Sequence, residues 1–180
     1  MSRHDIVAPK GAEPLTDPTS KYPQPPFNRQ SQPWPGLASR MDPRPDHGEI
    51  SYRGSGRLLG RKALITGGDS GMGRAAAIAY AREGADVAIN YFPSEEVDAQ
   101  EVIDLIEAEG RVGVAIPGDL RDEAFCNDLV AQAISGLGGL DILVSNAGRQ
   151  QAHDSMGSPQ GLHAKPRIQA RTGNIDYAAR

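Results

Sequence analysis

The stretch KALITGGDSGMGRAAAIAYAREGADVAINY, residues 62–91, governs the architecture of this 180-residue chain. Its apolar start, Ala63–Ile65, is bounded by turn residues, as is typical of a strand buried on both faces of a parallel sheet. A glycine-rich turn follows, and then an alanine-rich helix is expected from about Arg74 to Glu83, where a glycine ends it. Val87–Tyr91 predicts a second strand. The stretch therefore predicts a βαβ unit.

The turn between the first strand and the helix reads Thr66-Gly67-Gly68-Asp69-Ser70-Gly71-Met72-Gly73. Gly67 can take turn dihedrals, Gly71 lets the backbone come close to a diphosphate, and Gly73 lets the helix lie close to the strand. The helix N-terminus adds unpaired N–H groups and a partial positive charge. A glycine-rich turn alone is also consistent with a plain loop. Because the strand and helix stand in the required order, the pattern predicts a dinucleotide-binding site.

Two motifs together resemble those of the short-chain dehydrogenase/reductase family. The turn has the family's Thr-Gly-x-x-x-Gly-x-Gly spacing, and Asn146-Ala147-Gly148 matches its second marker. The pair is much more specific than either motif alone. The resemblance covers residues 61 to about 156. It implies an NAD(P)-dependent oxidoreductase that transfers hydride between the cofactor and a carbonyl or alcohol.

Helical and strand patterns alternate through the following residues. A helix capped by Ser94 is expected to end at Gly110, and further elements are expected at Val112–Ile116 (strand), Asp122–Ser135 (helix) and Ile142–Val144 (strand). This alternation implies right-handed crossovers and a parallel sheet of order 3-2-1-4. The predicted fold class is α/β, an incomplete Rossmann-type doubly wound parallel sheet with about the first four strands.

Residues 1–60 form a proline-rich N-terminal arm, which holds ten of the fourteen prolines and is expected to be largely irregular. The arm resembles the extension of a bacterial subgroup similar to glucose and ribitol dehydrogenases, which implies that it packs on the folded body. Composition alone leaves a disordered tail as an equal alternative. Trp34 and Tyr22 are candidates to anchor the arm on a neighbouring subunit. Residues 61–156 are the expected NAD(P)-binding half, and residues 157–180 an irregular remnant of the catalytic half.

Composition argues against several classes of partner. A formal net charge of −4 without a clustered basic face argues against nucleic acid and anionic membranes. The longest apolar run, Ala75–Ala81, is too short to span a bilayer, and no signal segment is visible. Cys126 is the only cysteine, and the four histidines lack metal-ligand spacing, so neither an internal disulfide nor a metal is expected. We expect a cytoplasmic protein.

Ligands of this fold lie at the carboxyl ends of the strands. At the second strand end, Asn90-Tyr91-Phe92 has no carboxylate to repel a 2′-phosphate and no arginine to attract one. The expected cofactor is NADP or NAD, with NADP weakly favoured. The resemblance implies that Asp119 accepts from the adenine amino group, although a helix N-cap is its alternative role. Asn146 is expected to tie neighbouring backbones together as much as to bind ligand.

The expected cofactor-binding residues are Gly67, Asp69, Ser70, Gly71, Met72, Gly73, Tyr91, Asp119, Leu120, Asn146, Ala147 and Gly148.

The catalytic set of the family is a Ser, a Tyr and a Lys four residues after the Tyr, which keeps the Tyr acidic enough for proton exchange. No tyrosine here has a lysine at that spacing. Ile175–Ala179 resembles the active-site segment of the subgroup, which makes Tyr177 the candidate catalytic residue, while Arg167 stands in the place of the serine. The neighbours His153–Ser155 are not spaced as a triad.

These features predict a truncated or internally deleted family member with impaired catalysis. A small alcohol or carbonyl substrate would be used only if the missing half were supplied. The alternatives are a nucleotide-binding or assembly subunit, forming oligomers with family relatives, and a nonfunctional fragment. The substrate and the oligomeric state cannot be read from these residues.

Overall fold

The computed structural model describes residues 17, 19–20 and 22–149. The chain divides into a unit that ends at Gln30 and a unit that begins at Ser31. In the first unit, the carboxylate of Asp17 accepts hydrogen bonds from the backbone N–H and the hydroxyl of Thr19. The described residues of this unit contain no helix or strand. The second unit contains all the elements discussed below.

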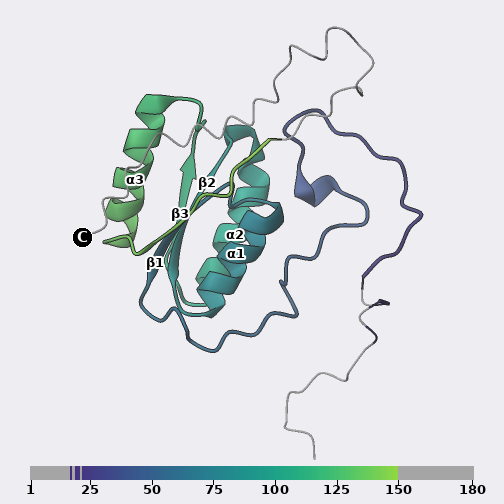
Figure 1. The fold of residues 1–180 in the computed structure, drawn as a ribbon, viewed down its shortest axis with the longest axis horizontal. Helices are drawn as coiled ribbons and strands as arrows, with labels where there is room; N and C mark the ends of the chain where they lie inside the picture. The colour runs from purple at the N-terminus through teal and green to yellow at the C-terminus, as the bar shows by residue number, and fades with distance from the viewer. Residues whose placement is uncertain (1–16, 18, 21, 150–180) are drawn as a thin grey trace, which may run out of the picture. The chain divides into compact units, whose positions relative to one another are not determined.

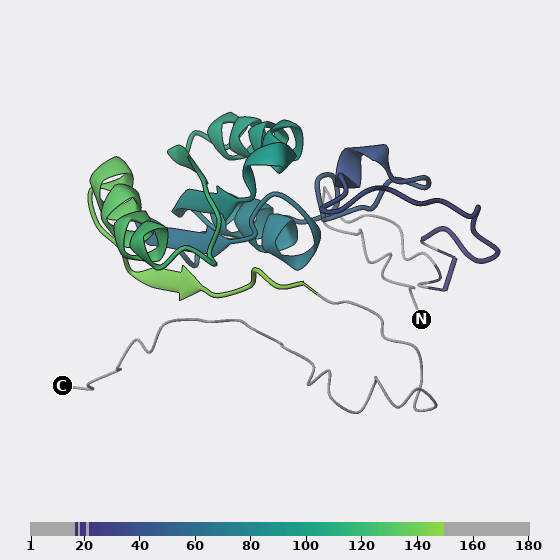
Figure 2. The same cartoon turned by 90° about the horizontal axis from the view of Figure 1, so that it is seen from above.

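A four-stranded parallel sheet forms the centre of the second unit (Figure 1). Its strands are β1 (Lys62–Thr66), β2 (Asp86–Tyr91), β3 (Gly113–Pro117) and β4 (Ile142–Val144). The strand order is β3-β2-β1-β4, with every pair parallel, so the predicted order is confirmed. β4 lies at one edge of the sheet (Figure 2).

Helices cover both faces of the sheet (Figure 1). They are α1 (Gly71–Arg82), α2 (Glu96–Ala108) and α3 (Glu123–Leu137). Successive strand residues point to opposite faces, so Ile65 packs with α1 and α2 while Leu64 packs with α3. Both side chains are fully buried. This two-sided burial explains why the strand centres, Ala63–Ile65 in β1 and Val87–Ile89 in β2, are continuously apolar rather than alternating.

Several predicted boundaries are wrong, among them those of β3, which is Gly113–Pro117 rather than Val112–Ile116, and three of the differences have a visible local reason. α1 begins at Gly71 rather than Arg74, because Ser70 supplies the first helical carbonyl, to the N–H of Arg74 at 3.0 Å. Ser94 is not an N-cap. It lies inside a 3₁₀ turn, η2 (Pro93–Glu95), because a proline readily opens a helical segment. α3 continues past Ser135 to Leu137, since the glycine that ends it is Gly138, which has φ 73°.

The part of the arm within the second unit, residues 31–60, packs on α1 and α2. The guanidinium of Arg82 donates to the carbonyls of Gly48, Glu49 and Tyr52. The carboxylate of Glu83 accepts from the Tyr52 hydroxyl at 2.6 Å and from two arm amides. These residues are therefore held to the folded body by hydrogen bonds, with one short 3₁₀ turn, η1 (Ala38–Arg40), as their only helical segment.

Further up the same helices, Arg74 bridges the arm and α2. Its Nε lies 2.9 Å from Glu49 of the arm, and its Nη1 lies 3.1 Å from Glu101 of α2. The Arg74 side chain is only 3% exposed, whereas the Glu49 and Glu101 side chains are 22% and 35% exposed, so the bridge is shielded from solvent on the arginine side alone. Among the residues that the structure describes, no helix has the length and apolar character to cross a membrane.

Candidate functional site

The glycine turn joins β1 to α1 through a very close backbone contact. Gly67 has φ +62°, which favours glycine at that position. A Cβ atom on Gly73 would lie 1.9 Å from the carbonyl oxygen of Gly67, a distance that no side chain could accept. Gly67 and Gly73 are therefore required by the fold of the turn itself, whatever binds there.

Gly71 differs from these two glycines because its open side faces empty space. Its φ is +53°, and a Cβ built there would meet no atom within 4 Å. The first N–H groups of an α-helix have no intrahelical acceptor, and the side chain of Ser70, the N-cap of α1, makes no capping hydrogen bond. Met72 is 82% exposed. The start of α1 thus combines accessible backbone with amides suited to an anion.

Asn146 ties β4 to the glycine turn. Its side-chain amide donates to the carbonyl oxygens of Thr66, at 3.1 Å, and Gly67, at 3.0 Å. The hydroxyl of Thr66 accepts the backbone N–H groups of Asn146 and Ala147 at 3.0 and 3.1 Å. The expected structural role of Asn146 is therefore visible, and it places Ala147 and Gly148 beside the turn.

Asp69 is a buried carboxyl group at the turn with an unsatisfied oxygen. The residue is 2% exposed, and its Oδ2 has no hydrogen-bond partner among the described residues. Burial raises the pKa of Asp69, and the negative charge of Asp98 acts in the same direction. An unpaired buried acceptor is costly, and a hydrogen bond donated by a ligand hydroxyl would satisfy this oxygen.

Tyr91 ends β2 with its hydroxyl turned toward Glu96. The hydroxyl donates to Glu96 Oε2 at 2.6 Å, and the residue is 2% exposed. Burial, followed by the hydrogen bond to Glu96, raises the pKa of Tyr91. The side chain of this expected cofactor-binding residue is thus engaged within the protein, although its backbone ends a strand at the edge where ligands bind.

Glu95 is a site residue that the sequence reading did not identify. It lies in η2 and lines a cavity of about 400 Å³ together with Ser70, Gly71 and arm residues including Gln32, Gly36 and Ala38. Burial, and then the charge of Asp69, raises the pKa of Glu95 to about 7. Its position just beyond the end of β2 could have indicated a place in the site. A glutamate in a predicted first helical turn, however, resembles an ordinary surface charge.

Asp119 follows β3 and forms an ion pair with Arg121. Arg121 Nε lies 3.0 and 2.9 Å from the two Asp119 oxygens. The hydrogen bond to Arg121 lowers the pKa of Asp119. The N-cap of α3 is Asp122, whose Oδ1 accepts from the N–H of Ala124 at 2.9 Å, so the N-cap alternative for Asp119 is wrong. Leu120 packs against the core beneath α3.

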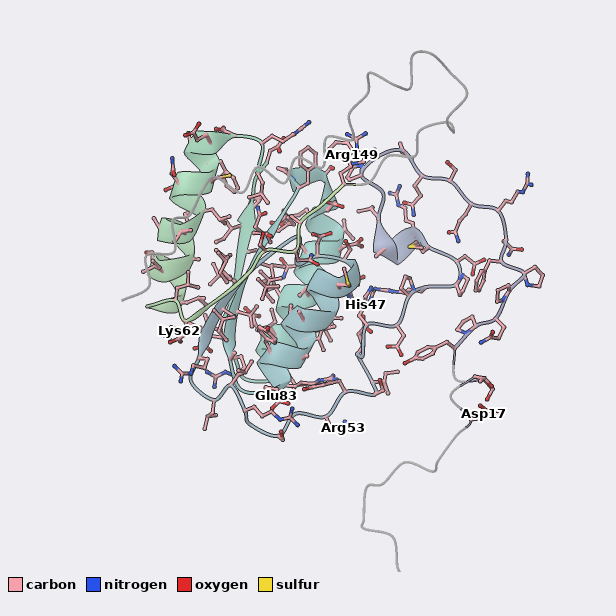
Figure 3. All side chains as sticks on the ribbon, in the orientation of Figure 1. Asp17, His47, Arg53, Lys62, Glu83 and Arg149 are labelled. Atoms are coloured by element: carbon pink, nitrogen blue, oxygen red, sulfur yellow. The ribbon has the colours of Figure 1, made fainter. Side chains whose placement is uncertain are left out.

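Four groups of residues follow the carboxyl ends of the four strands and so lie at the same end of the sheet: the glycine turn, Glu95, Asp119 and Asn146–Gly148. Figure 3 labels Arg149 at this carboxyl end and Lys62 at the opposite, amino end of the strands. Lys62 pairs there with Asp86 at 3.6 Å, which places Asp86 away from the site. The candidate catalytic residue Tyr177, together with Arg167 and His153–Ser155, lies outside the described residues.

Comparisons with known proteins agree with this arrangement. Residues 61–160 match the family model described as short chain dehydrogenase. An uncharacterized oxidoreductase, YhxD, of Bacillus subtilis is 63% identical over 142 residues, which cover 79% of this chain and 48% of that protein. Glucose and ribitol dehydrogenase of Daucus carota is 37% identical over 70% of this chain and 44% of its own length. The chain spans about half the length of the curated relatives it matches.

A solved structure shows the same likeness in three dimensions. It is a short chain dehydrogenase from Burkholderia cenocepacia in complex with NADP, with a TM-score of 0.50 and 48% sequence identity. The match covers 54% of this chain and 39% of that one. The glycine turn, the strand order, the family match and these relatives lead to one conclusion: the chain belongs to the short-chain dehydrogenase family.

Proposed function

We propose that this chain binds the dinucleotide NADP or NAD at the carboxyl edge of its sheet. The observation that carries the proposal is the open space beside Gly71, next to the uncapped N-terminus of α1. The diphosphate would lie against the amides of Gly71, Met72 and Gly73, where the helix dipole favours negative charge. When bound, the nicotinamide would supply the hydride chemistry of the family.

Other residues at the edge fit the remaining parts of the cofactor. The unpaired Oδ2 of Asp69 is suited to accept from a ribose hydroxyl. Asp119 is part of the proposed adenine site, and Asn146–Gly148 form its neighbouring wall beside the turn. Tyr91 contributes backbone rather than its hydroxyl, which is bound to Glu96. These assignments extend the sequence prediction to particular atoms.

NADP is the first candidate of the two cofactors. Residues 90–92 contain no carboxylate, and the Burkholderia cenocepacia relative is in complex with NADP, which supports this choice. An ionised Glu95 would instead disfavour NADP, because its negative charge would repel phosphate. Burial and the charge of Asp69 raise the pKa of Glu95 to about 7, which favours its neutral form and so reduces its repulsion of phosphate.

We further propose that the chain binds the cofactor without turning over substrate by itself. Arg167 stands in the place of the family's catalytic serine, and no Lys lies four residues after Tyr22, Tyr52, Tyr80 or Tyr91, so these residues do not supply the family's proton-transfer set. A nucleotide-binding subunit that assembles with family relatives is therefore the second candidate function. Alcohol oxidation and carbonyl reduction would require the other half of the relatives' length.

Calorimetric titration with NADP and NAD tests the proposal. Binding is expected for the intact chain and is expected to be lost in Gly71→Ala, whose methyl group would occupy the open side of the turn. The matched control is Gly110→Ala, since Gly110 has φ +70° and equally open surroundings but follows α2, away from the site. Equal losses in both variants, or no heat with either cofactor, would overturn the proposal. Hydride transfer by the purified chain would refute the absence of turnover.

A further inference from the structure

Trp34 is the only tryptophan of the chain and lies in a closed loop of the arm. The side-chain amide of Gln32 joins both sides of this loop. Its nitrogen donates to the carbonyl of Leu37, and its oxygen accepts the N–H of Leu37, both at 2.9 Å. The loop of residues 32–37 is therefore a defined structure, with Trp34 within it.

Residues that follow three different strands converge on the Trp34 indole. The Phe92 ring, after β2, lies 4.9 Å from it between centroids, at an interplanar angle of 55°. The guanidinium carbon of Arg149, beyond β4, lies 4.7 Å from the indole centroid, and that of Arg121, after β3, lies 5.9 Å away. Trp34 thus lies at the carboxyl edge of its own chain's sheet, where ligands of this fold bind.

The adjoining loop residues continue along the site toward the diphosphate end. Gly36 and Ala38 line the cavity of about 400 Å³ that also contains Ser70 and Gly71. At the other end, Arg121 connects the indole to Asp119, the residue placed at the adenine in the proposed function. The loop therefore extends from the proposed adenosine end of the site to the glycine turn.

The loop is attached to the body by Asp98, so its position does not depend on a ligand. The Asp98 carboxylate accepts the backbone N–H groups of Ala38 at 2.5 Å and Ser39 at 3.2 Å. Asp98 is 1% exposed. By contrast, half of the Trp34 surface, 50%, is exposed. A fixed loop with an accessible indole is the arrangement of a stacking platform rather than of a core residue.

We propose that Trp34 is a further cofactor-contacting residue, whose indole stacks on the adenine ring and closes the adenosine end of the site. This inference rests on the proposed dinucleotide binding. Adenine is a flat aromatic ring, and a base can stack on an aromatic side chain without any hydrogen bond to its edges. The guanidiniums of Arg149 and Arg121 lie over the indole ring and the Phe92 ring is tilted against it, so these groups set its position, and the adenine would stack on the ring surface that stays exposed. The arm thereby contributes directly to cofactor affinity.

Fluorescence of the full chain provides a direct test, since Trp34 is the sole indole. Titration with AMP and with adenosine 2′,5′-bisphosphate is expected to quench its emission, whereas nicotinamide mononucleotide should leave it unchanged. Equal responses to all three, or no response while calorimetry detects NADP, would overturn the inference and leave the proposed function intact.

Calorimetry of variants supplies the second arm of the test. Trp34→Ala is expected to raise the Kd for NADP about ten-fold, the effect of one lost base–aromatic stack, while Trp34→Phe should retain most of the affinity. Ile50→Ala, a 79% exposed residue of the same arm that does not line this cavity, is the control and should bind like the unmodified chain. Tighter binding by Trp34→Ala would mean that the indole obstructs the site, and unchanged binding would mean that it lies outside the site. Either result refutes the stacking role, whereas a chain that binds no dinucleotide refutes the proposed function first.

Discussion

The hydroxyl of Thr66 accepts the backbone N–H of Asn146 at 3.0 Å, although eighty residues separate the two in the sequence. In return, the side-chain amide of Asn146 donates to the Thr66 carbonyl at 3.1 Å. β4 is only three residues long and pairs with β1 alone among the described strands. The two motifs that define the family are therefore joined by side chains as well as by the sheet.

Replacing Thr66 by Val should weaken this connection. The substitution keeps the branched shape but leaves the N–H groups of Asn146 and Ala147 without their acceptor. We expect the free energy of unfolding to fall by about 0.5–1.5 kcal/mol, the usual net contribution of a hydrogen bond, since both N–H groups are partly buried. Chemical denaturation measures the change. Thr66→Ser, which keeps the hydroxyl, should lie much closer to the unmodified chain, and equal effects of the two would contradict the role given to the hydroxyl.

Glu95 should make both stability and cofactor binding depend on pH. Its pKa is raised by burial and by Asp69 to about 7, so between about pH 4.5 and 7 the folded chain holds more protons than the unfolded chain. Stability contributed by this group is present below pH 4.5 and falls as the pH rises through 7. Dinucleotide affinity should fall in the same direction, because ionised Glu95 would repel phosphate.

The Glu95→Gln variant tests this pH dependence. Urea denaturation above pH 7 should find it more stable than the unmodified chain, with the difference shrinking toward pH 4.5. Calorimetry should find a flatter pH profile for NADP. Glu107→Gln, on the exposed surface of α2, is the control. A Glu95→Gln profile parallel to that of the unmodified chain would refute the interpretation.

Glu83 should make the attachment of the arm sensitive to acid. The hydrogen bond from Tyr52, followed by those from the amides of Arg57 and Ser55, lowers the pKa of Glu83 to about 2. Because this value lies below the ordinary 4.5, the stabilisation is present above pH 4.5 and is lost as the pH falls toward 2. The carboxylate therefore holds the arm most strongly near neutral pH.

Denaturation of Glu83→Gln over this pH range gives the measurement. The variant should be less stable than the unmodified chain above pH 5 and should approach it near pH 2. Tyr52→Phe removes one donor and keeps the two amides, so its effect should be smaller in size and similar in pH dependence. A constant difference across the range would show that the charge of Glu83 is not what holds the arm.

The sheet could be predicted from the sequence because its signals are local and strong. Ala63–Ile65 and Val87–Tyr91 are apolar runs bounded by turns, and the helices between strands fix their parallel order. Helix boundaries were harder to predict, since glycine usually lies outside helices. Here Gly71 is the first residue of α1, and Gly136 lies inside α3. At the candidate site, the geometry of the glycine turn could be predicted from the spacing of its glycines. Contact with a cofactor stays a prediction.

The placement of the arm could not be predicted from composition. Its prolines indicate extended backbone, but its partners on the body are Arg82, Glu83 and Asp98, which read as ordinary surface charges of amphipathic helices. Hydrogen bonds from an irregular backbone to such charges leave no periodic pattern. Glu95 was missed for the same reason, since its burial depends on the arm that covers it.

The arm also has a consequence for the order of events during synthesis. The arm residues Ala38, Arg44, Glu49 and Tyr52 have hydrogen-bond partners on the body between Arg74 and Glu101, later in the sequence. A segment that leaves the ribosome early must therefore wait for both covering helices before it can dock. Contacts between such distant residues form slowly. Residues 31–60 are thus the first part of the second unit to be synthesised and among the last to become ordered. Their protection from a protease would show that α1 and α2 have formed.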